Sequence, residues 1–284
     1  MTIAEHTARA RDRLVASGIP AAEAALDARL LARHVLGWDL ARLVSNGQET
    51  AADVFSRDYD ALVTRRARRE PVAYILGERE FWGRSFAVTR DVLIPRPETE
   101  LIIDSLLQVR PDAATRFRAA DIGTGSGCLA VTLAAEYPAA TVVATDTSAA
   151  ALEIARANAR RHGVADRVTT FEADLLPPSD QSFDVVVSNP PYVSSVDRQT
   201  LAPEVRDFEP DSALYAGTDG LRVIRRLVQL APDRLAEGGL LLFEFGYGQS
   251  AEVGRLISAA PGLTMIELRR DLQSIPRIAI VRRT

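Results

Sequence analysis

The chain has 284 residues, of which 47% are hydrophobic and 25% charged, and its formal net charge at pH 7 is −4. This composition is typical of a soluble globular protein, and the length favours two domains over one. The weakly acidic balance argues against nonspecific binding to nucleic acid. The sequence shows neither an apolar span of about 18 residues nor a secretory signal, so we expect a cytoplasmic protein without membrane contact.

Cysteine and histidine are scarce and lysine is absent, which argues against disulfides, metal sites and lysine chemistry. Cys128 is the single cysteine, which excludes an intramolecular disulfide, and the three histidines are scattered among helix-like segments. We therefore expect no metal site. All 34 basic residues are arginine, so chemistry that depends on lysine is also excluded.

Residues 1–76 show the apolar spacing of helices and no strand alternation. Between Ala21 and Leu36, apolar side chains populate one broad face and charged side chains the other. We predict a small helical domain over residues 1–76 and assign it to substrate recognition. Eleven arginines balance eleven acidic residues over residues 1–78, which does not suit a DNA-binding arm. The run Arg65–Arg69 is interpreted as a solvated helix end, with a docking contact for a partner as the alternative.

Residues 77–97 are predicted to link the two domains. The stretch Glu80–Val88 alternates polar and apolar residues around a central glycine, as a short hairpin does. The rigid Pro95-Arg96-Pro97 then marks the domain boundary or forms a lid over a site. We assign residues 98–284 to a catalytic domain, beginning with a helix near Leu101–Val109 that Glu98 or Thr99 starts.

From Arg116 onward, strands alternate with helices, which predicts an α/β fold around a parallel sheet. The first strand, Phe117–Ile122, runs into the glycine-rich turn Gly123–Gly127, where a backbone without side chains allows close approach of a ligand. The Gly-x-Gly-x-Gly spacing differs from the Gly-x-Gly-x-x-Gly of dinucleotide sites. It therefore disfavours NAD and FAD.

The next two strands also end in candidate ligand-binding residues. Thr141–Thr145 ends in Asp146, which is placed to accept hydrogen bonds from both hydroxyls of a ribose; the alternative is that Asp146 caps the following helix. Val168–Glu172 leads to Asp174, placed to meet the amino edge of an adenine, and to Leu175, placed against its ring. Three strand ends therefore direct polar or glycine residues to one edge of the sheet.

The fourth strand, Phe183–Ser188, is a continuous apolar run that ends in Asn189-Pro190-Pro191-Tyr192. The prolines stop the strand and fix the carbonyl groups of Asn189 and Pro190 beside the side-chain carbonyl of Asn189. These acceptors are suited to grip the NH2 group of a planar amide or amine while Tyr192 covers its face. The alternative is an ordinary proline-rich loop with asparagine as a turn former.

The rest of the chain completes a sheet of about seven strands, the last pair antiparallel. The polar stretch Leu201–Gly220 flanks the expected substrate entrance. Glu244 falls inside the apolar run Leu240–Phe245, where a buried carboxylate needs a partner that the sequence does not identify.

Several of these motifs together resemble a known family. Three of them are similar to motifs of the Rossmann-like methyltransferases that use S-adenosylmethionine: Asp121-Ile122-Gly123-Thr124-Gly125-Ser126-Gly127, Asp146 and Asn189-Pro190-Pro191-Tyr192. Four further stretches narrow the resemblance: Glu70-Pro71 to Gly77, Glu80-Phe81-Trp82-Gly83, Ile94-Pro95-Arg96-Pro97-Glu98-Thr99-Glu100, and Glu209-Pro210 to Gly220. Over essentially its whole length the chain resembles the bacterial peptide chain release factor N5-glutamine methyltransferases, the HemK or PrmC family.

The resemblance implies a cofactor and a set of binding residues. S-adenosylmethionine would be bound and S-adenosylhomocysteine released, with Asp146 on the ribose. The other cofactor-binding residues would be Gly123, Thr124, Gly125, Ser126, Gly127, Asp174, Leu175 and Asn189. Relatives often carry an aromatic residue where Leu175 stands, which leaves apolar contact with the adenine in place of stacking.

The resemblance also implies a reaction and a partner. Asn189, Pro190, Pro191 and Tyr192 would bind the glutamine amide in the Gly-Gly-Gln motif of class I release factors. Asn189, Pro190 and Tyr192 would act catalytically in direct methyl transfer to N5, which modulates translation termination. Cys128 is expected to pack behind the glycine-rich turn and not to act as a nucleophile.

Three alternatives remain at this point. A related enzyme methylates a glutamine of a ribosomal protein. A DNA adenine N6-methyltransferase handles the same NH2 chemistry but needs base flipping and a basic recognition region, which this chain lacks, so no direct nucleic-acid substrate is expected. A noncatalytic sensor of S-adenosylmethionine would not need an intact site loop, Asn189-Pro190-Pro191-Tyr192.

Overall fold

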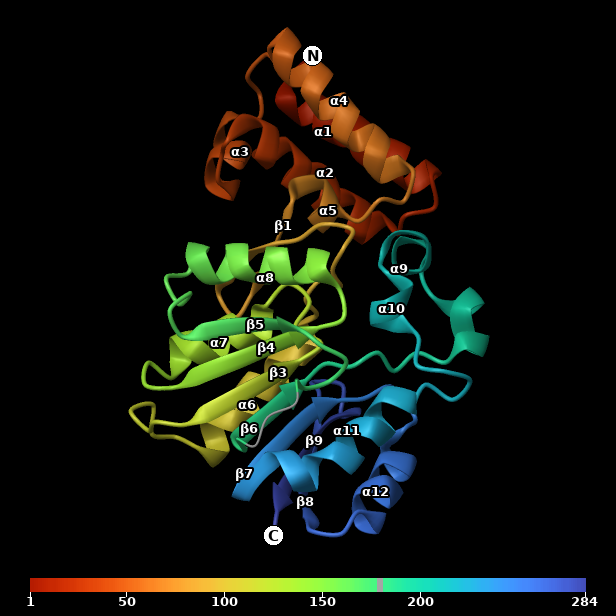
Figure 1. The fold of residues 1–284 in the computed structure, drawn as a ribbon. Coiled ribbons are helices and arrows are strands. Elements are labelled where there is room, and N and C mark those ends of the chain that lie inside the picture. The colour runs from red at the N-terminus through yellow and green to blue at the C-terminus, as the bar shows by residue number, and fades with distance from the viewer. Residues whose placement is uncertain (178–180) are drawn as a thin grey trace. The chain divides into compact units, whose positions relative to one another are not determined.

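The computed structural model describes residues 1–177 and 181–284 (Figure 1). These residues divide into two compact units. The first unit contains Met1–Glu78 together with a short segment from much later in the chain, Ala202–Phe208. The second unit contains the other described residues, including most of the hairpin that follows residue 78. The sequence gives no indication that residues 202–208 belong to the first unit.

The first unit is helical, as its apolar spacing predicts. Its helices are α1 (Ile3–Ala16), α2 (Ala21–Leu36), α3 (Leu40–Asn46), α4 (Asp53–Ala67), α5 (Val72–Leu76) and α9 (Pro203–Phe208). Thr2 and Glu5 form a reciprocal capping box at the start of α1, which satisfies two backbone N–H groups there. A buried apolar cluster contributed mainly by α1, α2 and α4, including Leu14, Leu31 and Tyr59, forms the core of this unit.

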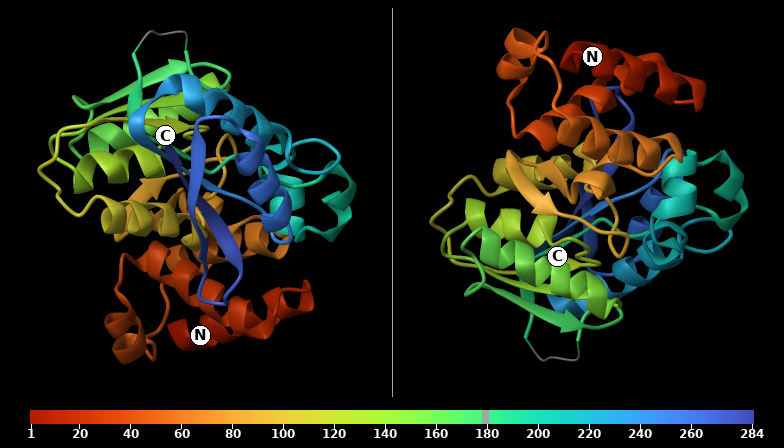
Figure 2. Two further views of the ribbon diagram at one scale, coloured as in Figure 1. Left: turned by 90° about the horizontal axis from the view of Figure 1, so that it is seen from below. Right: turned by 90° about the horizontal axis from the view of Figure 1, so that it is seen from above.

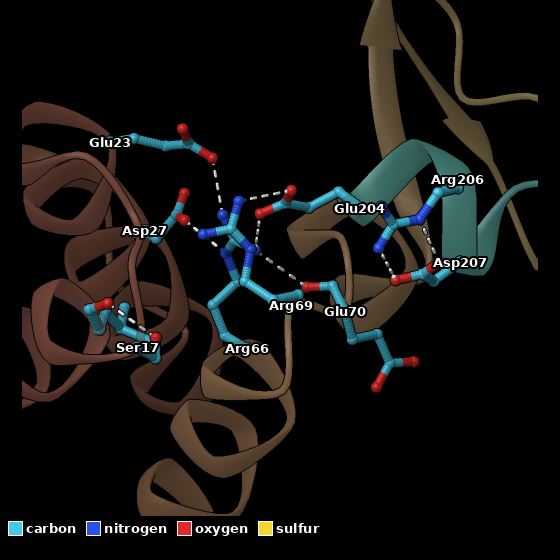
Figure 3. A network of polar contacts seen from close by, with 10 residues as sticks. Ser17, Glu23, Asp27, Arg66, Arg69, Glu70, Glu204, Arg206 and Asp207 are labelled. Atoms are coloured by element: carbon cyan, nitrogen blue, oxygen red, sulfur yellow. Dashed lines mark hydrogen bonds and ion pairs between the residues drawn. The ribbon is translucent and has the colours of Figure 1, made fainter. Parts of the chain in front are cut away.

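The arginine run at the end of α4 was predicted to be solvated, and for Arg66 this prediction is wrong. The Arg66 side chain is 1% exposed, and its guanidinium donates to Asp27 at 2.6 Å, Glu23 at 2.6 Å and Glu204 at 2.8 Å (Figure 3). Three carboxylates thus surround one buried cation. The physical reason is helical spacing: Arg66 follows the buried Tyr59 and Val63 by seven and three residues, so it lies on their face of the helix.

Glu204 links α9 to this cluster. It accepts hydrogen bonds from Arg66 and, at 2.8 Å, from Arg69. Burial opposes its ionisation, but the hydrogen bonds from the two guanidinium groups hold the pKa of Glu204 below its ordinary value. Arg65 makes a separate bidentate pair with Glu70, at 2.9 Å for both contacts, whereas Arg68 is exposed.

Within the described residues, the second unit is built on one seven-stranded sheet in the order β5-β4-β3-β6-β7-β9-β8. The first five strands in this order are parallel, and β9 runs antiparallel to both of its neighbours. This confirms the predicted α/β fold, including the antiparallel final pair. The strands are β3 (Arg118–Ile122), β4 (Thr141–Asp146), β5 (Val168–Glu172), β6 (Phe183–Ser188), β7 (Leu235–Glu244), β8 (Leu263–Arg270) and β9 (Pro276–Arg283), and a separate hairpin joins β1 (Glu78–Phe81) to β2 (Arg84–Ala87).

Helices cover both faces of the sheet (Figure 1 and Figure 2). Successive apolar residues of the central strands point to opposite faces, as the pleat requires. Val185 and Val187 join the buried cluster that includes α6 and α7, whereas Val186 joins the cluster that includes α11 and α12. The helical segments are the 3-10 turns Pro97–Thr99 and Ser195–Thr200, α6 (Glu100–Val109), α7 (Cys128–Glu136), α8 (Ala149–Arg161), α10 (Asp211–Leu214), α11 (Arg222–Arg234) and α12 (Ser250–Ala259).

Candidate active site

A cavity of about 430 Å³ lies in the second unit, beyond the carboxyl ends of β3, β4 and β6. The strand order reverses between β3 and β6, and open α/β sheets bind their ligands at such a point. Ten of the residues predicted from the sequence line this cavity: Gly123, Thr124, Gly125, Ser126, Asp146, Asp174, Leu175, Asn189, Pro190 and Pro191. Two others, Gly127 and Tyr192, do not belong to the described lining.

The glycine-rich turn owes its shape to left-handed backbone conformations. Gly125 has φ 54°, and a Cβ atom there would meet no protein atom within 4 Å. The space in front of this residue is therefore open to a ligand. Gly127 has φ 80°, but its Cβ would lie 3.1 Å from the Cα and Cβ of Ala155, so this glycine allows α8 to pack closely.

Asp121 shapes the turn from behind, a role that we did not assign from the sequence. Its Oδ2 accepts hydrogen bonds from Thr124 Oγ1 at 2.6 Å and from the Ala130 N–H at 3.1 Å. Burial raises the pKa of Asp121 to about 7. Its Oδ1 is buried and has no hydrogen-bond partner among the described residues. The sequence signal is an acidic residue inside an apolar strand.

Asp146, at the end of β4, connects the glycine-rich turn to α8. Its Oδ2 accepts from the Gly125 N–H at 2.9 Å, and its Oδ1 accepts from the Ser148 N–H at 3.0 Å. Ser148 is the N-cap of α8, since its side chain accepts from the Ala151 N–H. The alternative that Asp146 caps this helix is therefore wrong. Each of its carboxylate oxygens accepts one of these hydrogen bonds and retains a second lone pair, and Asp146 lines the cavity.

Beyond β5 lie Asp174 and Leu175, the two residues predicted to contact an adenine. Both are held in place by residues that the sequence did not suggest. Arg226 of α11 donates to both carboxylate oxygens of Asp174, at 3.0 and 2.9 Å, and Arg226 also lines the cavity. Leu175 has φ 72°, which is unfavourable for a residue with a Cβ atom. A hydrogen bond of 2.5 Å from Thr145 Oγ1 to the Leu175 carbonyl fixes this conformation and places the residue at the cavity wall.

Asn189, directly after β6, is held by a chain of side chains. Its Nδ2 donates to Thr99 Oγ1 at 2.8 Å, and Thr99 Oγ1 donates to Glu244 Oε2 at 2.6 Å. Tyr192 Oη donates to the other carboxylate oxygen of Glu244 at 2.8 Å. Thr99 and Tyr192 are thus the partners of the buried Glu244 that the sequence did not identify.

Burial shapes the ionisation of this cluster. Burial raises the pKa of Glu244, while its hydrogen bonds from Thr99 and Tyr192 favour the carboxylate; Glu98 and Arg277 act on it with opposite signs. Burial and the neighbouring Glu244 raise the pKa of Tyr192 well above its ordinary value. Tyr192 is therefore a neutral hydrogen-bond donor at physiological pH.

Three acceptors at the site loop are left without internal partners. The Asn189 Oδ1 and the backbone carbonyls of Asn189 and Pro190 accept no hydrogen bond from the described residues. Asn189 and Pro190 both line the cavity. The loop therefore offers oxygen atoms, and no positive charge of its own, to a ligand that carries N–H groups.

The segment containing Pro95 and Thr99 forms another part of the cavity wall. Glu209, whose side chain is 1% exposed, accepts hydrogen bonds from the Ile94 N–H at 3.2 Å and from Arg96 at 2.5 Å. This buried carboxylate anchors the proline-flanked Arg96. The polar stretch that follows residue 201 thus reaches the core of the second unit at Glu209, which its composition did not predict.

Gly220 supports the site loop through close packing, which leads to a testable prediction. It has φ 73°, and a Cβ there would lie 2.2 Å from the Tyr192 carbonyl oxygen. We expect Gly220→Ala to lower the free energy of unfolding by about 2–4 kcal/mol, because overpacking adds to left-handed strain. Gly238→Ala is the control, since Gly238 has φ 71° with no atom within 4 Å of its Cβ. Equal losses in urea denaturation would show that packing against Tyr192 contributes nothing.

Cys128 is not disposed to act as a nucleophile. It lines the cavity at the start of α7, but burial raises the pKa of its thiol to about 12. The thiol therefore stays protonated at neutral pH. In the described part of the chain, no group of three metal-ligating side chains comes together, and no helix is long and apolar enough to cross a membrane.

Two protein families match separate parts of the chain. Residues 98–205 match the family described as the methyltransferase small domain. Residues 5–77 match the family described as the PrmC N-terminal domain. The first match covers β3 to β6 and their carboxyl ends, where the cavity lies, and the second covers α2 to α5 and all but the first two residues of α1.

Similar proteins are found over the whole length of the chain. A release factor glutamine methyltransferase of Cereibacter sphaeroides is 43% identical over 282 residues, which are 99% of this chain and 99% of that protein. A release factor glutamine methyltransferase of Neisseria gonorrhoeae is 43% identical over 90% of this chain and 92% of its own length. The crystal structure of a methyltransferase from Pyrococcus furiosus has a TM-score of 0.51 at 16% identity, covers 79% of this chain and 96% of that one, and shares the fold.

Proposed function

Because the chain belongs to the family of release factor glutamine methyltransferases, we propose that it transfers a methyl group from S-adenosylmethionine to the N5 amide nitrogen of the Gly-Gly-Gln glutamine in class I release factors. The observation that carries this proposal is the set of unpaired oxygens on Asn189 and Pro190 at a ligand-sized cavity. Such oxygens match the two N–H groups of a primary amide.

The cavity residues are suited to hold S-adenosylmethionine, which supplies an electrophilic methyl group on its sulfonium. The open space at Gly125 accommodates the methionine part close to the backbone. Asp146 has lone pairs for the ribose hydroxyls, and Leu175 offers apolar contact to the adenine. The paired Asp174 keeps acceptor capacity for the adenine amino group beside Arg226.

The site loop acts on the glutamine amide. The acceptors of Asn189 and Pro190 hold both N–H bonds, so that the nitrogen lone pair is directed out of the amide plane toward the methyl group. S-adenosylmethionine held at Gly125 and Asp146 would supply the methyl group as an electrophile, and S-adenosylhomocysteine would be the other product. The nitrogen then loses one proton to water, because an alkylated, protonated amide is strongly acidic. The Tyr192 hydroxyl supports the loop by donating a hydrogen bond to Glu244.

Transfer of radiolabelled methyl groups tests the proposal. The substrates are a purified class I release factor, the same factor with its Gly-Gly-Gln glutamine replaced, total ribosomal proteins, and duplex DNA. We expect label on the intact factor and on none of the others. Label on the ribosomal proteins or on DNA in its place would overturn the proposed substrate but keep the methyltransferase assignment.

Asp146→Ala tests the ribose assignment. We expect the Kd for S-adenosylmethionine to rise about 10- to 150-fold, because hydrogen bonds to a charged group contribute about 1.5–3 kcal/mol. Glu172→Ala is the control, since Glu172 ends the neighbouring strand β5, is exposed and does not line the cavity. Titration calorimetry measures both affinities. An unchanged Kd in a folded Asp146→Ala protein would exclude a ribose contact.

A further inference from the structure

We propose that Glu244 and Thr99 are positioning residues that fix the orientation of the Asn189 side-chain amide, so that its Oδ1 and not its Nδ2 faces the substrate. This inference rests on the proposed function, because it concerns how the site loop receives an N–H group. It assigns a role to two residues that lie 145 positions apart in the chain and that come together beneath the site loop.

The orientation follows from counting protons. Glu244 accepts at both carboxyl oxygens, at Oε2 from the Thr99 hydroxyl and at Oε1 from Tyr192, so the single proton of Thr99 is committed to Glu244. Thr99 Oγ1 can then only accept from Asn189. The neighbouring atom of Asn189 must therefore be Nδ2, as the 2.8 Å contact has it, and Oδ1 is turned away.

The reversed orientation is disfavoured at this site. It would place Oδ1 of Asn189 against Thr99 Oγ1, whose proton is already committed to Glu244, and would expose an N–H donor to the substrate's own N–H groups. Tyr192 occupies the other oxygen of Glu244, so the carboxylate cannot release Thr99 by exchanging partners. Thr99 and Glu244 are 2% and 1% exposed, which limits replacement of these contacts by water.

Glu244→Gln is the sharpest change, because it keeps the size of the side chain and reverses the proton pattern. The amide oxygen of the variant side chain can still accept from Tyr192, and its amide nitrogen then donates to Thr99. Thr99 in turn donates to Asn189 Oδ1, so every group stays satisfied only when the Asn189 amide is reversed. We therefore expect a folded protein with a misdirected amide.

The experiment is a double-mutant cycle on the kcat of methyl transfer to the release factor. We expect Glu244→Gln and Thr99→Val each to lower kcat by about tenfold or more, with Thr99→Ser within about threefold of wild type, because serine retains the hydroxyl. In an Asn189→Ala background, the same two changes should have less than about threefold effect. The KM for S-adenosylmethionine should stay within about twofold throughout.

Equal losses in the two backgrounds would overturn the inference, because the residues would then act independently of Asn189. A full kcat in Glu244→Gln would do so as well. Melting curves identify any variant that is unfolded, and Glu244→Gln serves if Thr99→Val does not fold.

A second measurement separates this inference from the proposed function. In ¹⁵N-labelled protein without substrate, the side-chain amide resonances of Asn189 are assigned by their absence in Asn189→Ala. They should shift in Thr99→Val and Glu244→Gln but not in Thr99→Ser. Unchanged resonances would refute the positioning role, even if the wild-type enzyme proved to methylate a different substrate.

Discussion

Replacing Asn189 by alanine is expected to lower the kcat of methyl transfer by about 10²–10³-fold, the range for removing one preorganised hydrogen-bonding group that stabilises a transition state. The side chain supplies one of the three free acceptors at the site loop. The amide nitrogen is a poor nucleophile, so its alignment contributes more to the rate than to substrate binding. The Kd for S-adenosylmethionine should change little.

Single-turnover kinetics and titration calorimetry measure the two quantities separately. Gln108→Ala is a suitable control, because it removes an exposed side-chain amide on α6, away from the cavity lining. A parallel loss of cofactor affinity and kcat in Asn189→Ala would assign the residue to the support of the fold. Rates equal to wild type would refute the role of the side chain in aligning the amide.

The second large effect concerns stability. Arg66→Ala is expected to lower the free energy of unfolding of the first unit by about 3–5 kcal/mol, the usual cost of removing one member of a buried ion cluster. The substitution leaves Glu23, Asp27 and Glu204 facing one another without the cation that they share. It also opens a cavity where a fully buried side chain stood.

Tryptophan fluorescence reports on this unit alone in a Trp82→Phe background, since Trp38 is then the only tryptophan of the chain. Trp38 packs against the core of the first unit. Arg68→Ala is the matched control, being two positions away and exposed, and should cost less than about 0.5 kcal/mol. Similar urea midpoints for the two variants would show that the Arg66 cluster does not stabilise the unit.

Much of the fold was predictable because its signals are local. The apolar run Phe183–Ser188 ends at two prolines, and Thr141–Thr145 ends at Asp146, so the positions of strands β4 and β6 can be read from short windows of sequence. Parallel pairing then brings the carboxyl ends to one edge, which is why most of the predicted cofactor residues line a single cavity. Their individual roles remain predictions.

What the sequence could not supply are contacts between distant segments. Thr99 and Glu244 meet across 145 positions, and Arg226 reaches Asp174 across 52. No local pattern encodes such pairs. The buried Glu244 and Asp121 were nevertheless visible as charges inside apolar strands, which signals a partner without naming it. For Arg66 the charge of the run was given more weight than the helical spacing from Val63.

Because a ribosome synthesises the chain from its N-terminus, residues 202–208 join the first unit late. Helices α1 to α5 are complete once residue 76 has emerged, but Arg66 then has only the carboxylates of its own helical region. At about 5–20 residues per second, Glu204 follows on the order of ten seconds later. For that interval Arg66 has Glu23 and Asp27 as partners but lacks its hydrogen bond to Glu204, and the first unit has its full set of contacts only after β3 to β6 have been synthesised.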